Sequence, residues 1–142
     1  MIPDPTVREP GAIYETRCIA KAVLPVAGGI TLLVTHFGLN RSEAQNAAET
    51  VVSEIKRSPF PVILTGDFNL RPDDSLLQPI RDLLADTADH SDRPMLSYPS
   101  DHPTEKIDYI FASSSLKPTF VSVPQMIVSD HRPYLAVFDI DS

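Results

Sequence analysis

Four short polar segments of the chain carry the residue types that could perform chemistry on a substrate. Three of them directly follow apolar, β-prone runs: Thr35-His36, Gly66-Asp67-Phe68-Asn69 and Ser129-Asp130-His131. Because polar residues at strand ends can meet at one edge of a sheet, we expect these groups to lie along a common rim. Carboxylates and imidazoles ligate metals and exchange protons, so such a rim could perform acid–base or metal-assisted chemistry.

The fourth segment, residues 106–111, places a carboxylate within an apolar run. Asp108 lies directly between Ile107 and Tyr109. Burying an ionised carboxylate costs several kcal/mol unless it is paired or bound to a metal. The sequence therefore predicts that Asp108 has a partner of its own. Lys106 begins the same segment, and a cation there could contact a phosphate.

The other polar residues each have a structural interpretation as well. His36 could be a hydrogen-bonded histidine at a strand end, and Asp67 with Asn69 could form an Asx-type turn. Asp130 and His131 could belong to an ordinary loop. These alternatives stay open for each segment alone, and the joint presence of all four segments favours a site.

The runs between the polar segments alternate between strand and helix patterns. Two β-prone runs, residues 13–24 and 30–35, flank turn-forming residues and predict a hairpin. Residues 42–57 predict an amphipathic helix, because Ser42 and Gln45 have capping-box spacing and apolar residues recur at helical intervals.

The middle of the chain predicts a strand, a helix and a long loop. Residues 61–65 are typical of a short buried strand, and residues 76–84 of a helix in which Pro79 produces a kink or lies in the first turn. Residues 86–105 have no period and predict a long surface loop. The two histidines of this loop are expected to be solvated: His90 and His102.

Three strands are expected near the end of the chain, over residues 106–112, 119–128 and 134–140. Pro124 predicts that the second of them is an edge or bulged strand, because proline cannot donate to a ladder. At the other end, residues 1–12 are rich in proline and predict an extended lead-in.

Composition narrows the class of protein. The 142 residues suffice for one compact domain, and the single cysteine, Cys18, excludes an intramolecular disulfide and a cysteine-based zinc cluster. With 12 basic and 19 acidic residues the net charge is −7, so the chain as a whole does not attract nucleic acid or anionic membranes. No signal peptide or membrane-spanning run is recognisable, which leaves localisation unknown and mildly favours the cytoplasm.

Taken in order, the four polar segments resemble the endonuclease/exonuclease/phosphatase superfamily of deoxyribonuclease I-like, metal-dependent phosphoesterases. The matching motifs are Thr35-His36-Phe37-Gly38-Leu39, Gly66-Asp67-Phe68-Asn69, Lys106-Ile107-Asp108-Tyr109-Ile110-Phe111 and Ser129-Asp130-His131. The resemblance implies an α/β (α+β) fold, half of the four-layer α/β sandwich of that family, with one mostly antiparallel or mixed sheet and covering helices. Residues 13–142 would be the C-terminal portion of the family's domain, with the N-terminal half absent.

The resemblance also implies roles for individual residues. His131 resembles the family's general base or phosphate ligand, and Asp108 resembles the carboxylate that pairs with it. Asp130 resembles a metal ligand suited to Mg²⁺ or Mn²⁺, and Asp67 resembles the residue that orients the attacking water. The donors to the phosphoryl oxygens would be Asn69 and His36. Hydrolysis would proceed by in-line attack of water at phosphorus.

The N-terminal half of the family's domain carries a Gln-Glu strand whose glutamate is the other principal metal ligand, and this sequence has no such strand. We therefore expect a phosphodiester or phosphomonoester hydrolase that is weak or inactive as this chain. The alternative is a non-catalytic remnant that acts as an assembly or binding module. An exposed sheet face favours a homodimer, or the missing half, as partner. A small soluble phosphoester is mildly favoured over nucleic acid or lipid, and no stable membrane insertion is expected.

Overall fold

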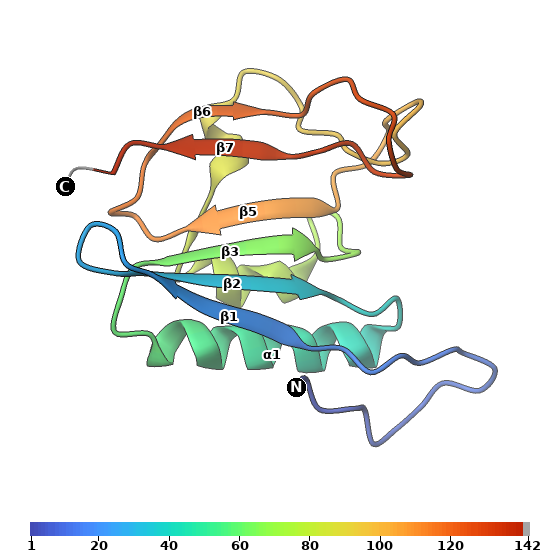
Figure 1. The fold of residues 1–142 in the computed structure, drawn as a ribbon. Coiled ribbons are helices and arrows are strands. Elements are labelled where there is room, and N and C mark those ends of the chain that lie inside the picture. Colours follow the sequence, from blue (N-terminus) through green and yellow to red (C-terminus); the bar gives the residue numbers. More distant parts are fainter. Residues whose placement is uncertain (141–142) are drawn as a thin grey trace.

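The computed structural model describes residues 1–140 and shows a mixed sheet with two helices, which is the predicted fold class (Figure 1). The strands are β1 (Ile19–Leu24), β2 (Ile30–His36), β3 (Val62–Asp67), β4 (Ala85–Asp86), β5 (Asp108–Ala112), β6 (Pro118–Ser122) and β7 (Leu135–Phe138). The helices are α1 (Arg41–Arg57) and α2 (Gln78–Arg81), with short 3₁₀ helices η1 (Ser75–Leu77) and η2 (Thr87–His90). One sheet has the order β1-β2-β3-β5-β4, and β6 and β7 form a separate two-stranded sheet.

Strand pairing places the ends of three neighbouring strands at one edge of the larger sheet. β1 and β2 are antiparallel and form the predicted hairpin, β2 and β3 are parallel, and β3 and β5 are antiparallel. The parallel register pairs His36 with Asp67, and the antiparallel register pairs Asp67 with Asp108. The two ladders therefore bring one histidine and two carboxylates into a single row.

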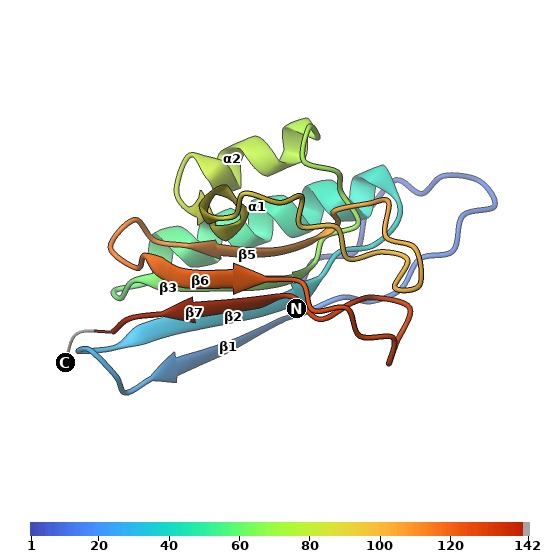
Figure 2. The ribbon, with the colours of Figure 1, turned by 90° about the horizontal axis from the view of Figure 1, so that it is seen from above.

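α1 connects β2 to β3 and packs against the sheet through its apolar side, as its helical spacing predicts (Figure 2). The buried apolar residues of this side are Ala44, Ala47, Ala48, Val51 and Ile55. The helix begins at Arg41, one residue earlier than predicted, and Asn40 is its N-cap instead of Ser42. Glu43 takes the place predicted for Gln45 in the capping box, since Glu43 Oε2 accepts a 3.4 Å hydrogen bond from the backbone N–H of Asn40.

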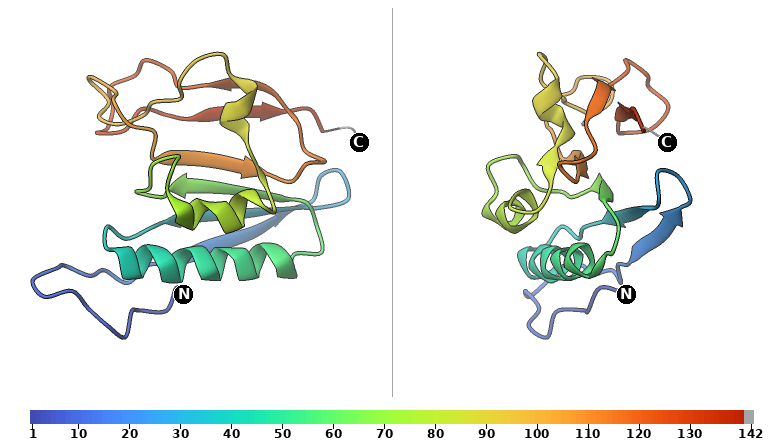
Figure 3. Two further views of the ribbon diagram at one scale, coloured as in Figure 1. Left: turned by 180° about the vertical axis from the view of Figure 1, so that it is seen from behind. Right: turned by 90° about the vertical axis from the view of Figure 1, so that its left-hand side faces the viewer.

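The core lies between the helices and the face of the sheet that they cover (Figure 3). Aromatic rings fill the part of the core nearest the polar rim. Phe37 and Phe68 are fully buried, and Phe68 packs edge-on against Tyr109 with ring centroids 5.3 Å apart. Because Phe37 directly follows His36 and Phe68 directly follows Asp67, burial of these rings fixes the polar side chains next to them at the rim.

Within residues 1–140, neither α1 nor α2 lies over the opposite face of the sheet (Figure 3). On β2, Val34 alternates with the buried core residue Leu33 and has 41% of its surface exposed. In the separate sheet, Leu135 and Val137 on β7 are exposed by 44% each. The expectation of a large exposed apolar face stays a prediction.

Several boundaries differ from those that the sequence predicts. β1 begins at Ile19, and residues 1–18 contain neither helix nor strand. β6 ends at Ser122, so Pro124 lies outside the strand and not within it. Pro79 lies in the first turn of α2, which is one of the two predicted arrangements. Among the described residues, no helix is both long and apolar enough to cross a membrane.

The segment 86–105 is more ordered than a surface loop. It contains η2 and an antiparallel bridge between Tyr98 and Glu105. Ser97 and Ser100 are buried. The sequence prediction of a polar surface loop is wrong for these serines, because hydrogen bonds to the chain compensate for their burial.

Candidate active site

The row formed by His36, Asp67 and Asp108 is completed by His131, which comes from the loop before β7. His36 Nε2 lies 3.4 Å from Asp67 Oδ2, and His131 Nε2 lies 3.6 Å from the same oxygen. Asp67 Oδ2 is thus flanked by two imidazoles from segments that are distant in sequence. The structure brings these four residues, which the sequence analysis singled out, to one edge of the sheet.

Asp108 has the partner that its position in an apolar strand requires. Asp108 Oδ2 lies 2.7 Å from His131 Nδ1. Because an ionised carboxylate only accepts hydrogen bonds, Nδ1 of His131 donates the proton. In neutral His131 this leaves Nε2 without a proton on the side that faces Asp67.

Electrostatic interactions shift the pKa values of three residues at this rim. Partial burial raises the pKa of the Asp67 carboxyl. Partial burial lowers the pKa of His131, but the hydrogen bond and the charge of Asp108 outweigh it and hold this pKa above its ordinary value. A hydrogen bond from Ser129 Oγ holds the pKa of exposed Asp130 below its ordinary value. The rim therefore holds a carboxylate and an imidazole that are both more basic than usual.

Asn69 lies in the site and also has the structural role that the sequence allows. Its backbone N–H donates to Asp67 Oδ1 at 2.8 Å, which forms the Asx-type turn, and its φ of 49° lies in the left-handed region that asparagine tolerates. The side-chain Nδ2 donates to Phe37 O at 2.8 Å. This bond uses one of the two amide hydrogens and leaves the other hydrogen and Oδ1 for a ligand.

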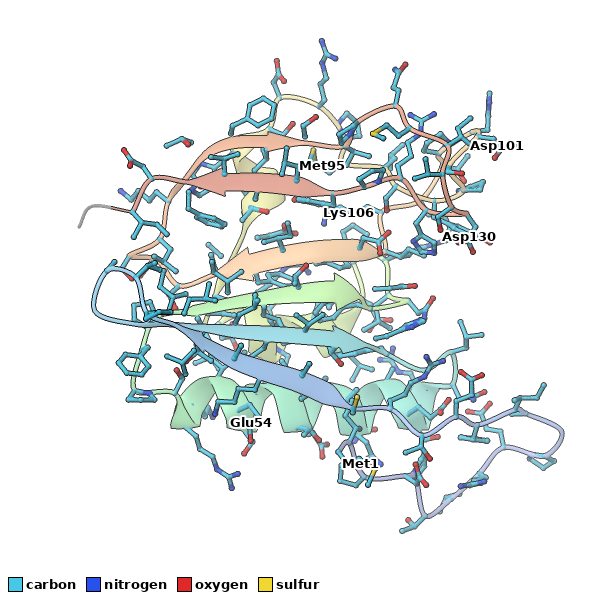
Figure 4. All side chains as sticks on the ribbon, in the orientation of Figure 1. Met1, Glu54, Met95, Asp101, Lys106 and Asp130 are labelled. Carbon is cyan, nitrogen blue, oxygen red and sulfur yellow. The ribbon has the colours of Figure 1, made fainter. Side chains whose placement is uncertain are left out.

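An open pocket of about 470 Å³ lies over this cluster, with a wall formed by Arg17, His36, Leu39, Asp67, Asn69, Tyr98, Glu105, Ile107, Asp130 and His131. Figure 4 shows Asp130 at the edge of the sheet where β3 ends and β5 begins. Five of the six predicted site residues line the pocket directly, and Asp108 contributes through its hydrogen bond to His131.

Arg17 is a candidate functional residue that sequence reasoning missed. Its NH1 lies 3.1 Å from His36 Nδ1, and its NH2 donates to Glu15 Oε2 at 2.5 Å. Because a guanidinium only donates, Nδ1 of His36 is the acceptor and Nε2 carries the proton that faces Asp67. No motif marks Arg17, which precedes β1, and only the fold places it beside the end of β2.

Two more contacts come from the segment that was predicted to be a surface loop. Ser97 Oγ donates to Asp108 Oδ2 at 2.5 Å, and the ring of Tyr98 packs on the ring of His131 with centroids 4.8 Å apart. The segment has no periodicity, and its serine and tyrosine are common residue types in loops. The sequence therefore held no signal for either contact.

Lys106, His90 and His102 do not line this pocket. Lys106 is buried, and its Nζ donates to Asp108 O at 3.2 Å and lies 3.4 Å from Asp86 Oδ2 of β4. Burial lowers the pKa of Lys106 to about 8, although the charge of Asp86 opposes this shift. His90 lines a different pocket, and His102 is exposed.

The donor groups of the site are of the kind that a divalent cation requires. Ligand atoms of Asp67, Asp108 and His131 lie within 4.8 Å of one another. Asp130, the ligand that the sequence analysis predicts, lines the same pocket but stands outside this group. Carboxylate oxygens suit hard cations such as Mg²⁺ and Mn²⁺, so the residues present fit the ion that the resemblance implies.

A comparison with models of protein families gives the class of protein. A model of the Endonuclease/Exonuclease/phosphatase family matches residues 3–131. The chain belongs to this family. No match was found among curated proteins.

Solved structures share the fold at low sequence identity. A mannosyl-6-phosphatase of Bacteroides thetaiotaomicron is 20% identical with a TM-score of 0.68, and the match covers 79% of this chain and 52% of that one. A family protein from Leptotrichia buccalis is 23% identical with a TM-score of 0.70, covering 86% and 53%. TDP2 from D. rerio, in complex with a single-strand DNA product, is 17% identical with a TM-score of 0.69, covering 87% and 62%. The chain thus spans about half the length of the first of these structures.

Proposed function

We propose that this chain carries part of the active site of a divalent-metal-dependent phosphoesterase, which hydrolyses a phosphodiester or phosphomonoester by in-line attack of water. The observation that carries this proposal is the Asp108–His131 pair, whose free Nε2 faces Asp67 across 3.6 Å at the wall of an open pocket. The same wall holds a guanidinium, a second imidazole and an amide. Such a site can move a proton and hold a phosphoryl group at the same place.

Proton transfer is assigned to the acidic and imidazole groups. Asp67 orients the attacking water through Oδ2, and His131 Nε2 accepts the proton of that water as general base. Asp108 stabilises the imidazolium that forms, because it accepts from Nδ1 at 2.7 Å. The water oxygen bonds to phosphorus as the P–O bond to the leaving group breaks, and the leaving oxygen takes a proton from solvent.

Binding of the non-bridging phosphoryl oxygens is assigned to His36, Asn69 and Arg17. Each lines the pocket and retains donor capacity: the amide hydrogen of Asn69, Nε2–H of His36 and the guanidinium of Arg17. Fixed donors of this kind contribute to phosphoryl transfer mainly by positioning and by charge neutralisation.

Mg²⁺ or Mn²⁺ would be held mainly by Asp130, with Asp67 as a further carboxylate of the pocket wall. The lowered pKa of Asp130 keeps it ionised, and therefore able to ligate a cation, at neutral pH. When bound, the ion supplies neutralisation of the charge that develops on the phosphoryl oxygens.

We further propose that residues 13–142 correspond to the C-terminal portion of the family's domain, with residues 1–12 as a lead-in, and that the chain alone is a weak catalyst. The match to about half of the mannosyl-6-phosphatase structure supports this view. A small soluble phosphoester is the favoured substrate class, because a net charge of −7 disfavours an extended polyanion. One structural neighbour is named a mannosyl-6-phosphatase, although another is bound to single-strand DNA.

The second candidate function is a non-catalytic assembly module. The observation that favours it is the set of exposed apolar side chains on β1, β2 and β7, which could contact another protein. A module of this kind would keep the fold and the apolar surface but would not need the Asp108–His131 pair.

The test is hydrolysis of bis-p-nitrophenyl phosphate and p-nitrophenyl phosphate with Mg²⁺ or Mn²⁺ by wild type, His131→Asn and the matched control His102→Asn. His102 is exposed and does not line the pocket. We expect turnover that is lost in His131→Asn and kept in His102→Asn. Equal rates in all three proteins contradict the proposal, and the absence of turnover in wild type favours the assembly module.

A further inference from the structure

Ser97 is fully buried at the back of the candidate site, where it contacts Asp108. Its hydroxyl donates to Asp108 Oδ2 at 2.5 Å, and this is the same oxygen that accepts from His131 Nδ1 at 2.7 Å. With two donors on one oxygen, the carboxylate of Asp108 cannot rotate without breaking a hydrogen bond to one of them. Ser97 therefore restrains the group that orients the imidazole.

The backbone around Ser97 also holds the loop that carries His131. Arg132 N donates to Ser97 O at 2.7 Å, so the residues on both sides of the Asp108–His131 hydrogen bond are joined by a second bond. Three residues after Ser97, Ser100 N donates to Asp130 O at 2.8 Å. The loop is therefore attached directly before and directly after His131.

Side chains reinforce this attachment. Ser100 Oγ donates to Ser129 O at 2.5 Å, and Arg132 Nε donates to Ser100 O at 2.6 Å. The ring of Tyr98 packs on the His131 ring with an interplanar angle of 46°. Residues 97–100 thus contact the loop 129–132 through backbone, hydroxyl, guanidinium and aromatic groups.

Residues 97–100 are themselves anchored next to β5. Ser97 N and Tyr98 N donate to Glu105 O at 3.0 and 3.2 Å, and Glu105 N donates to Tyr98 O at 2.9 Å. This short ladder lies just before Asp108 in the chain. The segment is thereby fixed to the strand that supplies Asp108 and to the loop that supplies His131.

We propose that residues 97–100 form a positioning clamp for the Asp108–His131 pair, in which Ser97 is the residue that fixes the orientation of Asp108 and hence the Nδ1–H tautomer of His131. The catalytic consequence rests on the proposed phosphoesterase function, whereas the structural consequence does not. Ser97 is a positioning residue, because it acts on the pocket through Asp108 and His131 and does not line the pocket.

A purely structural role makes a different prediction. If Ser97 only satisfied a buried carboxylate, its loss would lower the free energy of unfolding and leave the imidazole as it is. If Ser97 positions Asp108, its loss changes the state of the His131 ring in protein that is still folded. Replacement by threonine, which keeps the hydroxyl, should restore the wild-type state in the second case.

The test is long-range ¹H–¹⁵N NMR of the histidine rings in wild type, Ser97→Ala, Ser97→Thr and the control Ser115→Ala, with His131 signals assigned through His131→Asn. Ser115 is exposed and does not line the pocket. Wild type should show His131 as the Nδ1–H tautomer with a proton that exchanges slowly with solvent. We expect exchange to become about tenfold faster in Ser97→Ala, as befits the loss of one hydrogen bond to a charged group, and to recover in Ser97→Thr.

A wild-type-like His131 spectrum in folded Ser97→Ala overturns the clamp, whatever the enzymatic activity. If Ser97→Ala does not fold, as judged by circular dichroism, Ser97→Thr and Ser100→Ala decide the question. The clamp is supported if the Nδ1 proton of His131 exchanges at the wild-type rate in Ser97→Thr and faster than that in Ser100→Ala. Any other combination contradicts the clamp.

Hydrolysis of bis-p-nitrophenyl phosphate separates the clamp from the proposed function. With turnover in wild type, Ser97→Ala should lower kcat about tenfold at unchanged KM, and Ser97→Thr should recover it. Absence of turnover in wild type, together with the expected NMR change, would refute the proposed function and leave the clamp intact.

Discussion

Asp67 and Asp108 are direct partners across the β3–β5 ladder, so two carboxylates that are distant in sequence face the same imidazole. His131 joins them, because its Nδ1 lies 2.7 Å from Asp108 and its Nε2 lies 3.6 Å from Asp67. Two neighbouring carboxylates repel each other unless a donor lies between them. The site therefore depends on the register of this ladder and on the position of the loop that carries His131.

Gly66→Ala should disrupt the row by forcing β2 and β3 apart. Gly66 has a φ of 155°, and an added Cβ would lie 1.8 Å from Thr35 O, which is backbone and cannot move aside. We expect the free energy of unfolding, measured by urea denaturation, to fall by about 3 kcal/mol or more.

Gly28→Ala is the matched control for this change. Gly28 also has a positive φ, 79°, but among the described residues no heavy atom beyond its own chain neighbours lies within 4 Å of the added Cβ. Only the backbone strain remains, so the free energy of unfolding should fall by about 1 kcal/mol. Equal losses in the two variants would show that close contact of β2 and β3 at Gly66 is unimportant.

The pH dependence of stability should reveal the Asp108–His131 pair. The folded pKa of His131 lies above its ordinary value of 6.5, so the folded state favours the protonated ring. This contribution to the free energy of unfolding is fully present below pH 6.5 and is lost as pH rises through the folded pKa. Asp108→Asn should lower the pKa of His131 in an NMR titration and remove this pH dependence. An unchanged pKa of His131 in the variant would contradict the pairing.

Lys106 should change the free energy of unfolding with pH in the opposite direction to His131. Its pKa falls from 10.5 to about 8 because burial disfavours the charged amine, so the folded state binds the proton less tightly than the unfolded chain. Stability should therefore rise between pH 8 and 10.5, by up to about 3 kcal/mol, and this rise should be absent in Lys106→Met. Parallel curves of unfolding free energy against pH for the two proteins would show that the amine is not perturbed.

The fold was largely predictable because its elements carry local signals. The apolar positions of α1, the hairpin of β1 and β2, and Pro79 in the first turn of α2 all follow from periodicity and turn chemistry. Segment 86–105 was not predictable, because hydrogen bonds from distant residues order it, such as the one between Ser97 and Asp108. For the same reason the sequence indicated His131 and Asp108 but not Arg17, whose position depends on how the chain before β1 passes the end of β2.

Self-association is expected from the apolar side chains on the open face of the sheet. Val34 on β2 is exposed there, and Val137 on β7 of the separate sheet is also exposed. Soluble proteins rarely leave such surfaces uncovered, so we expect a homodimer in light scattering coupled to size-exclusion chromatography. Val34→Lys should shift the distribution toward monomer, while Lys117→Glu, a change at an exposed charged residue, should not. A wild-type protein that is monomeric at all concentrations would refute this expectation.

Calorimetric titration of Mg²⁺ and Mn²⁺ into wild type, Asp130→Ala and Asp89→Ala tests the central proposal most directly when combined with hydrolysis of bis-p-nitrophenyl phosphate. Asp130 lines the pocket, whereas Asp89 is an exposed carboxylate on η2 that does not. The proposal predicts saturable binding of the cation and turnover in wild type and Asp89→Ala, and loss of both in Asp130→Ala. Identical heats and rates in wild type and Asp130→Ala would contradict a metal-dependent phosphoesterase site at this edge of the sheet.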